Sequence, residues 1–130
     1  MLVVDASFVV DACLVNSGLE RLRKHEAVAP PLMWSEVLSV LHELQYRRTI
    51  SPDLAAQARR RLLDAPIASR KPAALSERTW LIADGFGWAK TYDAEYVALA
   101  QLLHCPLLTL DARLQKTASR LVAIANVADL

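Results

Sequence analysis

The stretch from Ala89 to Leu114 constrains the fold most, because it predicts a buried helix followed at once by a buried strand. Only one residue between Tyr96 and Leu103 is polar, so a helix that begins near Tyr92 should be buried on more than one side. Pro106 breaks the chain after this helix. The apolar run from Leu107 to Leu110 then predicts a short strand.

Two carboxylates border this helix and strand. Asp93 lies in the first turn of the predicted helix, and Asp111 follows the predicted strand. A buried charge without a partner is costly, and the ends of parallel strands line the crevice where ligands usually bind. Each acid also has a simpler interpretation, since Asp93 complements the helix dipole and Asp111 can cap the next helix. Both interpretations stay open at this point.

Short apolar runs alternate with helical patterns along the rest of the chain. This alternation favours right-handed βαβ units, and hence one α/β domain over residues 1–130. We expect a central parallel sheet of four or five short strands flanked by helices. The predicted strands outside the central stretch are Leu2–Val4, Ala27–Ala29, a minor one at Ile67–Ala68, and Leu121–Ala125. The predicted helices are Phe8–Leu14, Leu32–Arg48, Asp53–Asp64 and one from about Ala74.

Asp5 follows the first predicted strand just as Asp111 follows a later one. Ser7 could cap the next helix, in which case Asp5 would be a turn residue with no further task. If the two strands are neighbours, however, Asp5 and Asp111 lie at one edge of the sheet. The helix that carries Asp93 must then cross close by. Three acids from distant parts of the sequence are therefore expected near one crevice.

Glu36 is a fourth acid without a local explanation. No Lys or Arg lies three or four residues from it, whereas Glu43 has Arg47 four residues on, in the favourable order. It also lies off the stripe of its helix that we expect to face the core, which consists of Trp34, Leu38, Leu41 and Leu44 or Gln45. Glu36 could therefore join the other three acids.

Several carboxylates without a basic partner repel one another, and a divalent cation removes that conflict. Ligands that are all oxygen favour Mg²⁺ or Mn²⁺ over zinc. Such an ion can activate water and hold the non-bridging oxygens of a phosphodiester. The chain has no glycine-rich phosphate loop, serine nucleophile elbow or GxGxxG run, so dinucleotide binding and acyl transfer are poorly supported.

Composition narrows the class of protein further. Apolar residues make up 54% of the chain, which argues against disorder. No apolar run approaches the ~20 residues of a membrane helix, and the N-terminus does not resemble a signal peptide. Cys13 and Cys105 are isolated and apolar in context, as in a reduced cytoplasmic protein, although a disulfide stays open. A net charge of +1 argues neither for nor against nucleic acid.

The order of motifs closely resembles that of PIN-domain ribonucleases, and more narrowly that of VapC toxins from toxin–antitoxin pairs. The motifs are Asp5-x-Ser7, Glu36 on a long helix, YDAEYVALA from Tyr92, and Thr109-Leu-Asp111. Their combination is specific, although each part alone is not. The resemblance spans the whole chain and implies a PIN-like three-layer sandwich.

The resemblance also implies a site and an activity. It places Asp5, Glu36, Asp93 and Asp111 on the family's four acidic positions around one or two Mg²⁺ or Mn²⁺ ions. Asp5 and Asp93 would be direct ligands, and Glu36 and Asp111 would complete the site directly or through water. Ser7 and Thr109 match hydroxyl positions that support these ligands, and Asn126 is a looser match. The implied function is a metal-dependent endoribonuclease toxin that acts on structured RNA, of the tRNA or ribosomal RNA class.

Partners and alternatives follow from the same resemblance. We expect a small antitoxin protein and a homodimer, with the helices Leu32–Arg48 and Asp53–Leu63 supplying apolar surface. These helices could equally well cover only the domain's own core. The alternative functions are a PIN fold used as an RNA- or protein-binding module, and a small Mg²⁺-dependent phosphohydrolase of another α/β type.

Overall fold

Four short parallel strands form the centre of the molecule, in the order β3–β2–β1–β4. The structure is a computed structural model that describes residues 1–130. The strands are β1 (Leu2–Val4), β2 (Ala27–Ala29), β3 (Ala68–Ser69) and β4 (Leu107–Leu108). β1, β2 and β4 are buried along their whole length, as their uninterrupted apolar runs predict for strands covered on both faces.

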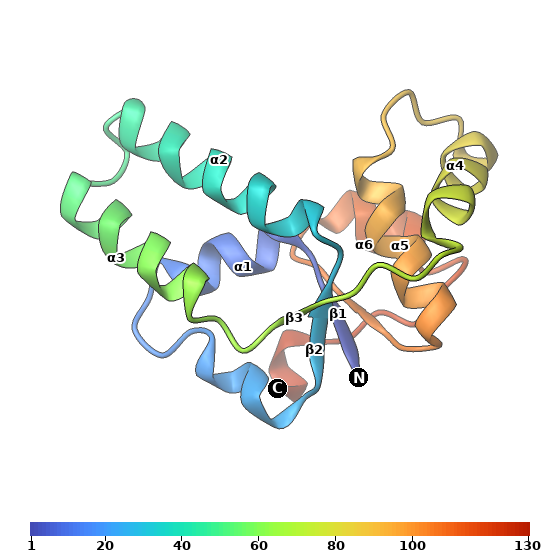
Figure 1. Cartoon of the computed structure of the whole chain (residues 1–130), viewed down its shortest axis with the longest axis horizontal. Coiled ribbons are helices and arrows are strands. Elements are labelled where there is room, and N and C mark those ends of the chain that lie inside the picture. The colour runs from blue at the N-terminus through green and yellow to red at the C-terminus, as the bar shows by residue number, and fades with distance from the viewer.

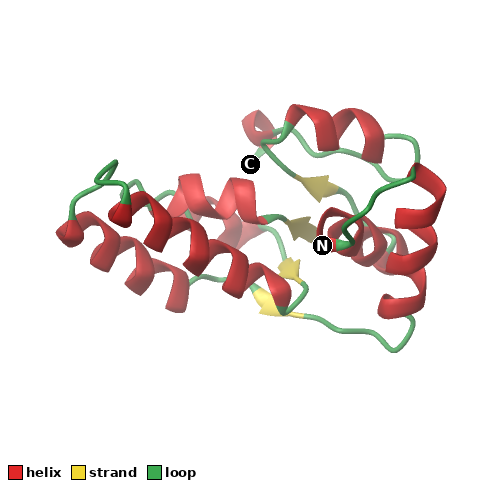
Figure 2. Cartoon of the chain, turned by 90° about the horizontal axis from the view of Figure 1, so that it is seen from above, coloured by secondary structure: helices red, strands yellow, loops and turns green.

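Six α-helices cover the two faces of this sheet, which confirms the predicted PIN-like sandwich of three layers. The helices are α1 (Ala6–Cys13), α2 (Leu32–Tyr46), α3 (Pro52–Leu63), α4 (Leu75–Phe86), α5 (Tyr92–Leu103) and α6 (Ala112–Ala118). Two 3₁₀ turns, η1 (Glu20–Lys24) and η2 (Val127–Asp129), complete the chain. Figures 1 and 2 show α1, α2 and α3 on one side of the strands and α4, α5 and α6 on the other. None of the helices has both the length and the apolar character that a membrane crossing requires.

Local signals explain where most of these helices begin and end. α3 begins with Ser51, whose hydroxyl accepts a hydrogen bond from Leu54 N, and with a proline in its first turn. α4 ends at Gly87, which has a φ of 69°. α5 begins at Tyr92 as predicted and ends at His104, which also adopts a left-handed conformation.

Four details of the sequence prediction are wrong. α1 begins at Ala6 rather than Phe8, because Asp5 and not Ser7 caps it. The buried line of α2 is Met33, Val37 and Leu41, because the helix turns Leu38 toward a surface groove beside α3. The other two concern the C-terminal part of the sheet.

β4 ends at Leu108 rather than Leu110, because the side chain of Thr109 bonds to Asp5 and Leu110 turns outward. The predicted strand Leu121–Ala125 is reduced to a single bridge between Ile124 and Leu107. An apolar run of this length is compatible with strand or loop, and only its partners decide between them.

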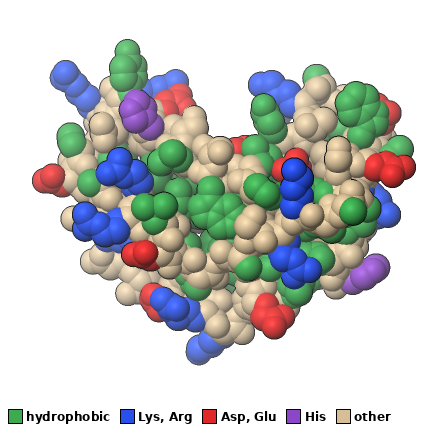
Figure 3. Space-filling model, in the orientation of Figure 1, with side chains coloured by type: hydrophobic (Ala, Val, Ile, Leu, Met, Phe, Trp, Pro, Cys, Tyr) green, Lys and Arg blue, Asp and Glu red, His purple; other side chains and the backbone are tan.

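The carboxyl ends of β1 and β4 lie side by side, as the sequence predicts. The two strands are paired, and Asp5 N donates a hydrogen bond to the Leu108 carbonyl at 3.1 Å. Figure 3 shows a notch at this edge of the sheet, between the two groups of helices, with acidic side-chain atoms at its bottom. The fold therefore directs the ends of β1 and β4 toward an open depression.

The exit from α1 depends on Gly18. A Cβ at this position would lie 2.2 Å from the carbonyl oxygen of Ala12, so the backbone would have to shift. We expect Gly18→Ala to lower the free energy of unfolding by about 1–3 kcal/mol, the usual range for overpacking. Urea unfolding measures this. The matched control is Gly85→Ala in α4, where nothing lies within 4 Å and the change should stabilise by roughly 0.5 kcal/mol. Equal effects in both variants would contradict the argument.

Candidate active site

Asp5 is the most buried acid of the chain, with 4% of its surface exposed. Its Oδ1 accepts hydrogen bonds from the Ser7 hydroxyl at 2.7 Å and from Phe8 N at 3.2 Å. Its Oδ2 accepts one from the Thr109 hydroxyl at 2.5 Å. Burial raises the pKa of this carboxyl, and the three neutral donors only partly oppose that effect. The side chain is therefore fixed in position, but its charge is not neutralised.

Ser7 and Thr109 tie the end of β1 to the end of β4. Their hydroxyl oxygens are 3.2 Å apart, and both donate to Asp5. The backbone then donates to each hydroxyl in turn: Leu110 N to Ser7 at 2.9 Å, and Asp111 N to Thr109 at 3.1 Å. The structure thus brings both predicted supporting residues into contact with Asp5.

Glu36 reaches the notch from α2 and is half-buried. Its Oε1 accepts a hydrogen bond from the Tyr96 hydroxyl of α5 at 2.5 Å. Burial raises the pKa of Glu36, the charges of Asp93, Asp5 and Glu95 raise it further, and the Tyr96 hydrogen bond opposes them. Sequence reasoning missed Tyr96. The available signal was a tyrosine at the start of the apolar part of the helix, since a buried tyrosine hydroxyl usually needs a partner.

Asp93 is exposed in the first turn of α5 and receives no hydrogen bond from another side chain. Partial burial of the carboxyl raises its pKa, and the charge of Asp111 adds to that rise. The charge of Asp93 in turn raises the pKa of both Asp5 and Glu36. The structure therefore couples all four predicted acids through Asp93. We call these four residues, Asp5, Glu36, Asp93 and Asp111, the acid cluster.

Asp111 has the simpler role that the sequence left open, and it also borders the cluster. Its Oδ1 caps α6 by accepting from Arg113 N at 2.9 Å and Leu114 N at 3.2 Å. The charge of Asp111 is also close enough to Asp93 to raise the pKa of that carboxyl. Asn126, the looser match, caps the turn η2 through Ala128 N and makes no hydrogen bond to the cluster.

Glu95 is a fifth carboxylate beside the cluster that sequence reasoning missed. Burial raises the pKa of Glu95, while the charge of Lys71 lowers it. Its charge contributes to the raised pKa of Glu36. It lies two residues after Asp93 in α5, so its position on a helix turned toward the notch was the signal available in the sequence.

No basic side chain forms an ion pair with the acid cluster. The chain's three ion pairs join the Met1 amino group to Glu26, Arg23 to Glu20, and Arg47 to Glu43. Oxygen donors without a basic partner suit a hard divalent cation. However, no three His, Cys, Asp or Glu side chains form a ready-made metal site in this structure. The acids are therefore electrostatically coupled without being already arranged around a common point.

Each anchored acid retains one oxygen with at least one unused lone pair. Oδ1 of Asp5 has two donors, whereas Oδ2 has one. Oε1 of Glu36 is bonded to Tyr96, and Oε2 has no partner. Oδ1 of Asp111 has two donors, and its Oδ2 has none. The cluster is thus both positioned by the fold and open to an additional ligand.

This fold, with carboxylates at the ends of β1 and β4, is that of a PIN domain. The chain belongs to the PIN-domain family, whose description matches residues 2–120. Within that family it is of the VapC type, which confirms the resemblance seen in the sequence.

Three relatives support this membership, and one solved structure shares the fold. The chain is 38% identical over 122 residues to Ribonuclease VapC9 of Mycobacterium tuberculosis and to VapC ribonuclease Mb0985 of Mycobacterium bovis, with 90% of this chain and 91% of each relative covered. It is 38% identical over 124 residues to Ribonuclease VapC1 of Mycobacterium tuberculosis, covering 86% of both chains. The crystal structure of PAE2754 from Pyrobaculum aerophilum superposes with a TM-score of 0.70 at 21% identity, covering 89% of this chain and 83% of that one. This last likeness concerns the fold alone.

The coupling of Asp93 to the cluster is testable by stability. Asp93→Asn should raise the free energy of unfolding in EDTA by up to about 1 kcal/mol, because it relieves like-charge repulsion; exposure and salt reduce the value. Added Mg²⁺ should stabilise the wild type and have little effect on this variant. Urea unfolding with and without Mg²⁺ measures both effects.

Asp53 supplies the matched control, since it is an exposed first-turn acid of α3 outside the cluster. Asp53→Asn should lower the free energy of unfolding by about 0.3–1 kcal/mol through the lost dipole interaction. A loss of the same size in Asp93→Asn, with the Mg²⁺ response unchanged, would mean that Asp93 is only a first-turn acid.

Proposed function

We propose that this protein is a divalent-metal-dependent endoribonuclease that acts as the toxin of a type II toxin–antitoxin pair. The observation that carries the proposal is a set of four coupled carboxylates without a basic partner, two of which follow the carboxyl ends of adjacent parallel strands. The three VapC relatives described above are all named as ribonucleases, which supports the reaction class. Structured RNA of the tRNA or ribosomal RNA class is the proposed substrate.

The donor set fits Mg²⁺, with Mn²⁺ as a substitute. Asp5 and Asp93 are the proposed direct ligands, and Glu36 and Asp111 complete the site directly or through water. When bound, such a cation supplies an activated water and a counter-charge for phosphodiester oxygens. Binding must draw the acids closer together, because they do not form a ready-made site.

The chain's own residues do the positioning. The hydroxyls of Ser7 and Thr109 hold Asp5, so the carboxylate keeps its place although its neighbours repel it. Both hydroxyls are neutral, so they leave the negative charge of Asp5 available to a cation. Without a counter-charge the same cluster repels an RNA phosphate. RNA binding in the notch should therefore depend on the divalent ion.

Two other functions remain as alternatives. A PIN fold used only as an RNA- or protein-binding module would not need acids at all four positions, and this chain has all four. A small phosphohydrolase would act on phosphate monoesters rather than on RNA. Parallel assays with RNA and with a small phosphate ester, each with and without chelator, separate these functions from the proposed one.

Cleavage of a labelled structured RNA should require Mg²⁺ or Mn²⁺ and stop in EDTA. Asp5→Asn and Asp93→Asn should each lower the rate by more than about 100-fold, since even residues behind the ligands of a metal site typically cost 10–100-fold. Asp11→Asn is the matched control, because Asp11 is exposed on α1 away from the cluster. This variant should cleave RNA at the wild-type rate. Undiminished cleavage in EDTA would refute the proposal.

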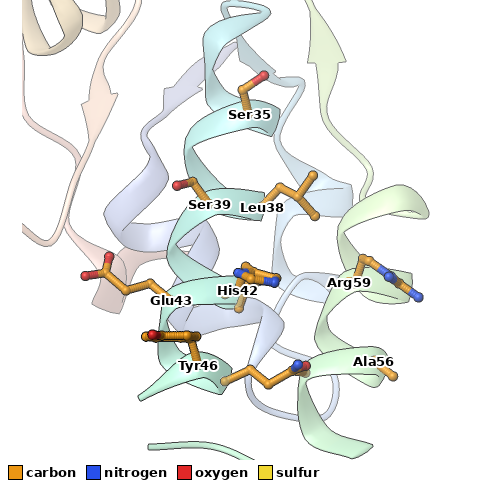
Figure 4. Close-up of a pocket in the computed structure, with 11 residues that line it drawn as sticks. Ser35, Leu38, Ser39, His42, Glu43, Tyr46, Ala56 and Arg59 are labelled. Carbon is orange, nitrogen blue, oxygen red and sulfur yellow. The ribbon is translucent and has the colours of Figure 1, made fainter. Parts of the chain in front are cut away.

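The proposed partner is a small antitoxin protein, and the structure contains a groove that could receive part of it. The groove lies between α2 and α3 and has a volume of about 840 Å³ (Figure 4). Leu38 and Tyr46 line it, with 47% and 81% of their surfaces exposed. An apolar segment of the antitoxin, laid along α2, would cover this surface. A second copy of the chain is the other partner that we expect.

Co-expression with the product of the adjacent open reading frame should give a complex heavier than this chain alone, measured by light scattering. Leu38→Glu should weaken that complex by at least about tenfold, because it places a charge in the groove. Leu63→Glu is the control, since Leu63 is 76% exposed on α3 and does not line the groove. A monomeric mass in both preparations would count decisively against these partners.

A further inference from the structure

We propose that Tyr96 is a positioning residue, which holds Glu36 in place for the cation from the opposite side of the notch. The inference rests on the proposed function, because it concerns how the same site binds its ion. It assigns a task to a side chain that lies outside the set of predicted ligands. The residue acts through Glu36 and is not itself a ligand.

The hydrogen bond between these residues connects two layers of the fold. Glu36 lies on α2 and Tyr96 on α5, 60 residues later in the chain and on the other side of the sheet (Figure 1). It is the only side-chain hydrogen bond that joins a helix of the α1–α3 side to a helix of the α4–α6 side. The position of Glu36 in the notch is therefore set from outside its own helix.

The burial of the two partners shows which one is fixed. Tyr96 is 1% exposed, so its ring is held by the core and its hydroxyl has a defined position. Glu36 is only half-buried, and α2 offers it no partner of its own. A glutamate on a helix surface samples several rotamers, and ordering it costs conformational entropy. The hydrogen bond to Tyr96 removes that freedom before an ion binds, which is how preorganisation improves affinity.

The chemistry of the donor matters as much as its position. A Lys or Arg at this place would hold Glu36 equally well but would neutralise it and compete with the cation. The phenol is a neutral donor with a single O–H, so it occupies Oε1 only and leaves Oε2 with its full acceptor capacity. Tyr96 thus orients the carboxylate without consuming its charge.

The test measures Mn²⁺ binding to the full chain in the absence of RNA, by calorimetry or electron paramagnetic resonance. Tyr96→Phe retains the buried ring and removes only the hydroxyl. It should weaken Mn²⁺ binding by about tenfold, within the range for residues that support metal ligands. Tyr92→Phe is the matched control, since Tyr92 lies on the same helix, is exposed, and makes no hydrogen bond through its hydroxyl. Its Mn²⁺ affinity should equal that of the wild type.

A double-mutant cycle separates positioning from a general effect on the fold. If Tyr96 acts only through Glu36, then Tyr96→Phe should change Mn²⁺ affinity little in a Glu36→Gln background. A tenfold loss that persists in that background overturns the inference, as does an unchanged affinity in Tyr96→Phe alone. If Tyr96→Phe does not fold, Glu36→Asp tests the same contact. The aspartate side chain is one methylene shorter, so it cannot accept the Tyr96 hydrogen bond and reach the ion at the same time. An unchanged affinity there also overturns the inference.

The same data keep this inference apart from the proposed function. If the wild type binds Mn²⁺ and cleaves RNA while Tyr96→Phe does both equally well, only the role of Tyr96 is wrong. If the wild type neither binds Mn²⁺ nor cleaves RNA, the proposed function fails and the role of Tyr96 fails with it.

Discussion

The site depends on a carboxylate that the protein buries and holds but does not neutralise. Asp5 is almost fully buried, yet its three hydrogen-bond donors are two hydroxyls and one backbone N–H. Neutral donors offset only part of the cost of burying charge. The donors come from the start of α1 and from Thr109 at the end of β4. Because β1 and β4 are paired, these donors stay in place around Asp5 despite the remaining cost of burying its charge. The same pairing brings Asp111 to the edge of the notch.

Each of the two groups of helices contributes two of the four acids to the notch. α1 and α6 begin at its bottom, where Asp5 and Asp111 serve as their caps. α2 and α5 form the walls and each contribute an acid, Glu36 and Asp93. Helix capping and the proposed cation binding thus draw on the same two carboxylates, Asp5 and Asp111, which explains why each of them has a plausible local role when it is viewed alone. The function that we propose for the four acids rests on the coupling of their charges.

Much of this could be predicted from the sequence, because strand and helix alternation is a local signal. The bounds of β1 and the start of α5 followed from it, as did the position of the carboxyl ends of β1 and β4 at one edge of the sheet. The role of Tyr96 did not, since its partner lies 60 residues away on another layer. The buried face of α2 was also misjudged, because helical spacing alone does not show where a neighbouring helix leaves a groove.

The number of hydrogen bonds that each carboxylate oxygen already accepts bears on ion selectivity. Oδ1 of Asp5 and Oδ1 of Asp111 each accept two hydrogen bonds already, so neither carboxylate can chelate an ion through both oxygens. Calcium favours about 6–8 oxygen ligands and commonly uses bidentate carboxylates, whereas magnesium takes one oxygen from each carboxylate and keeps several waters. In the proposed site, the capping bonds of α1 and α6 therefore restrict Asp5 and Asp111 to coordination through one oxygen each, which suits magnesium better than calcium.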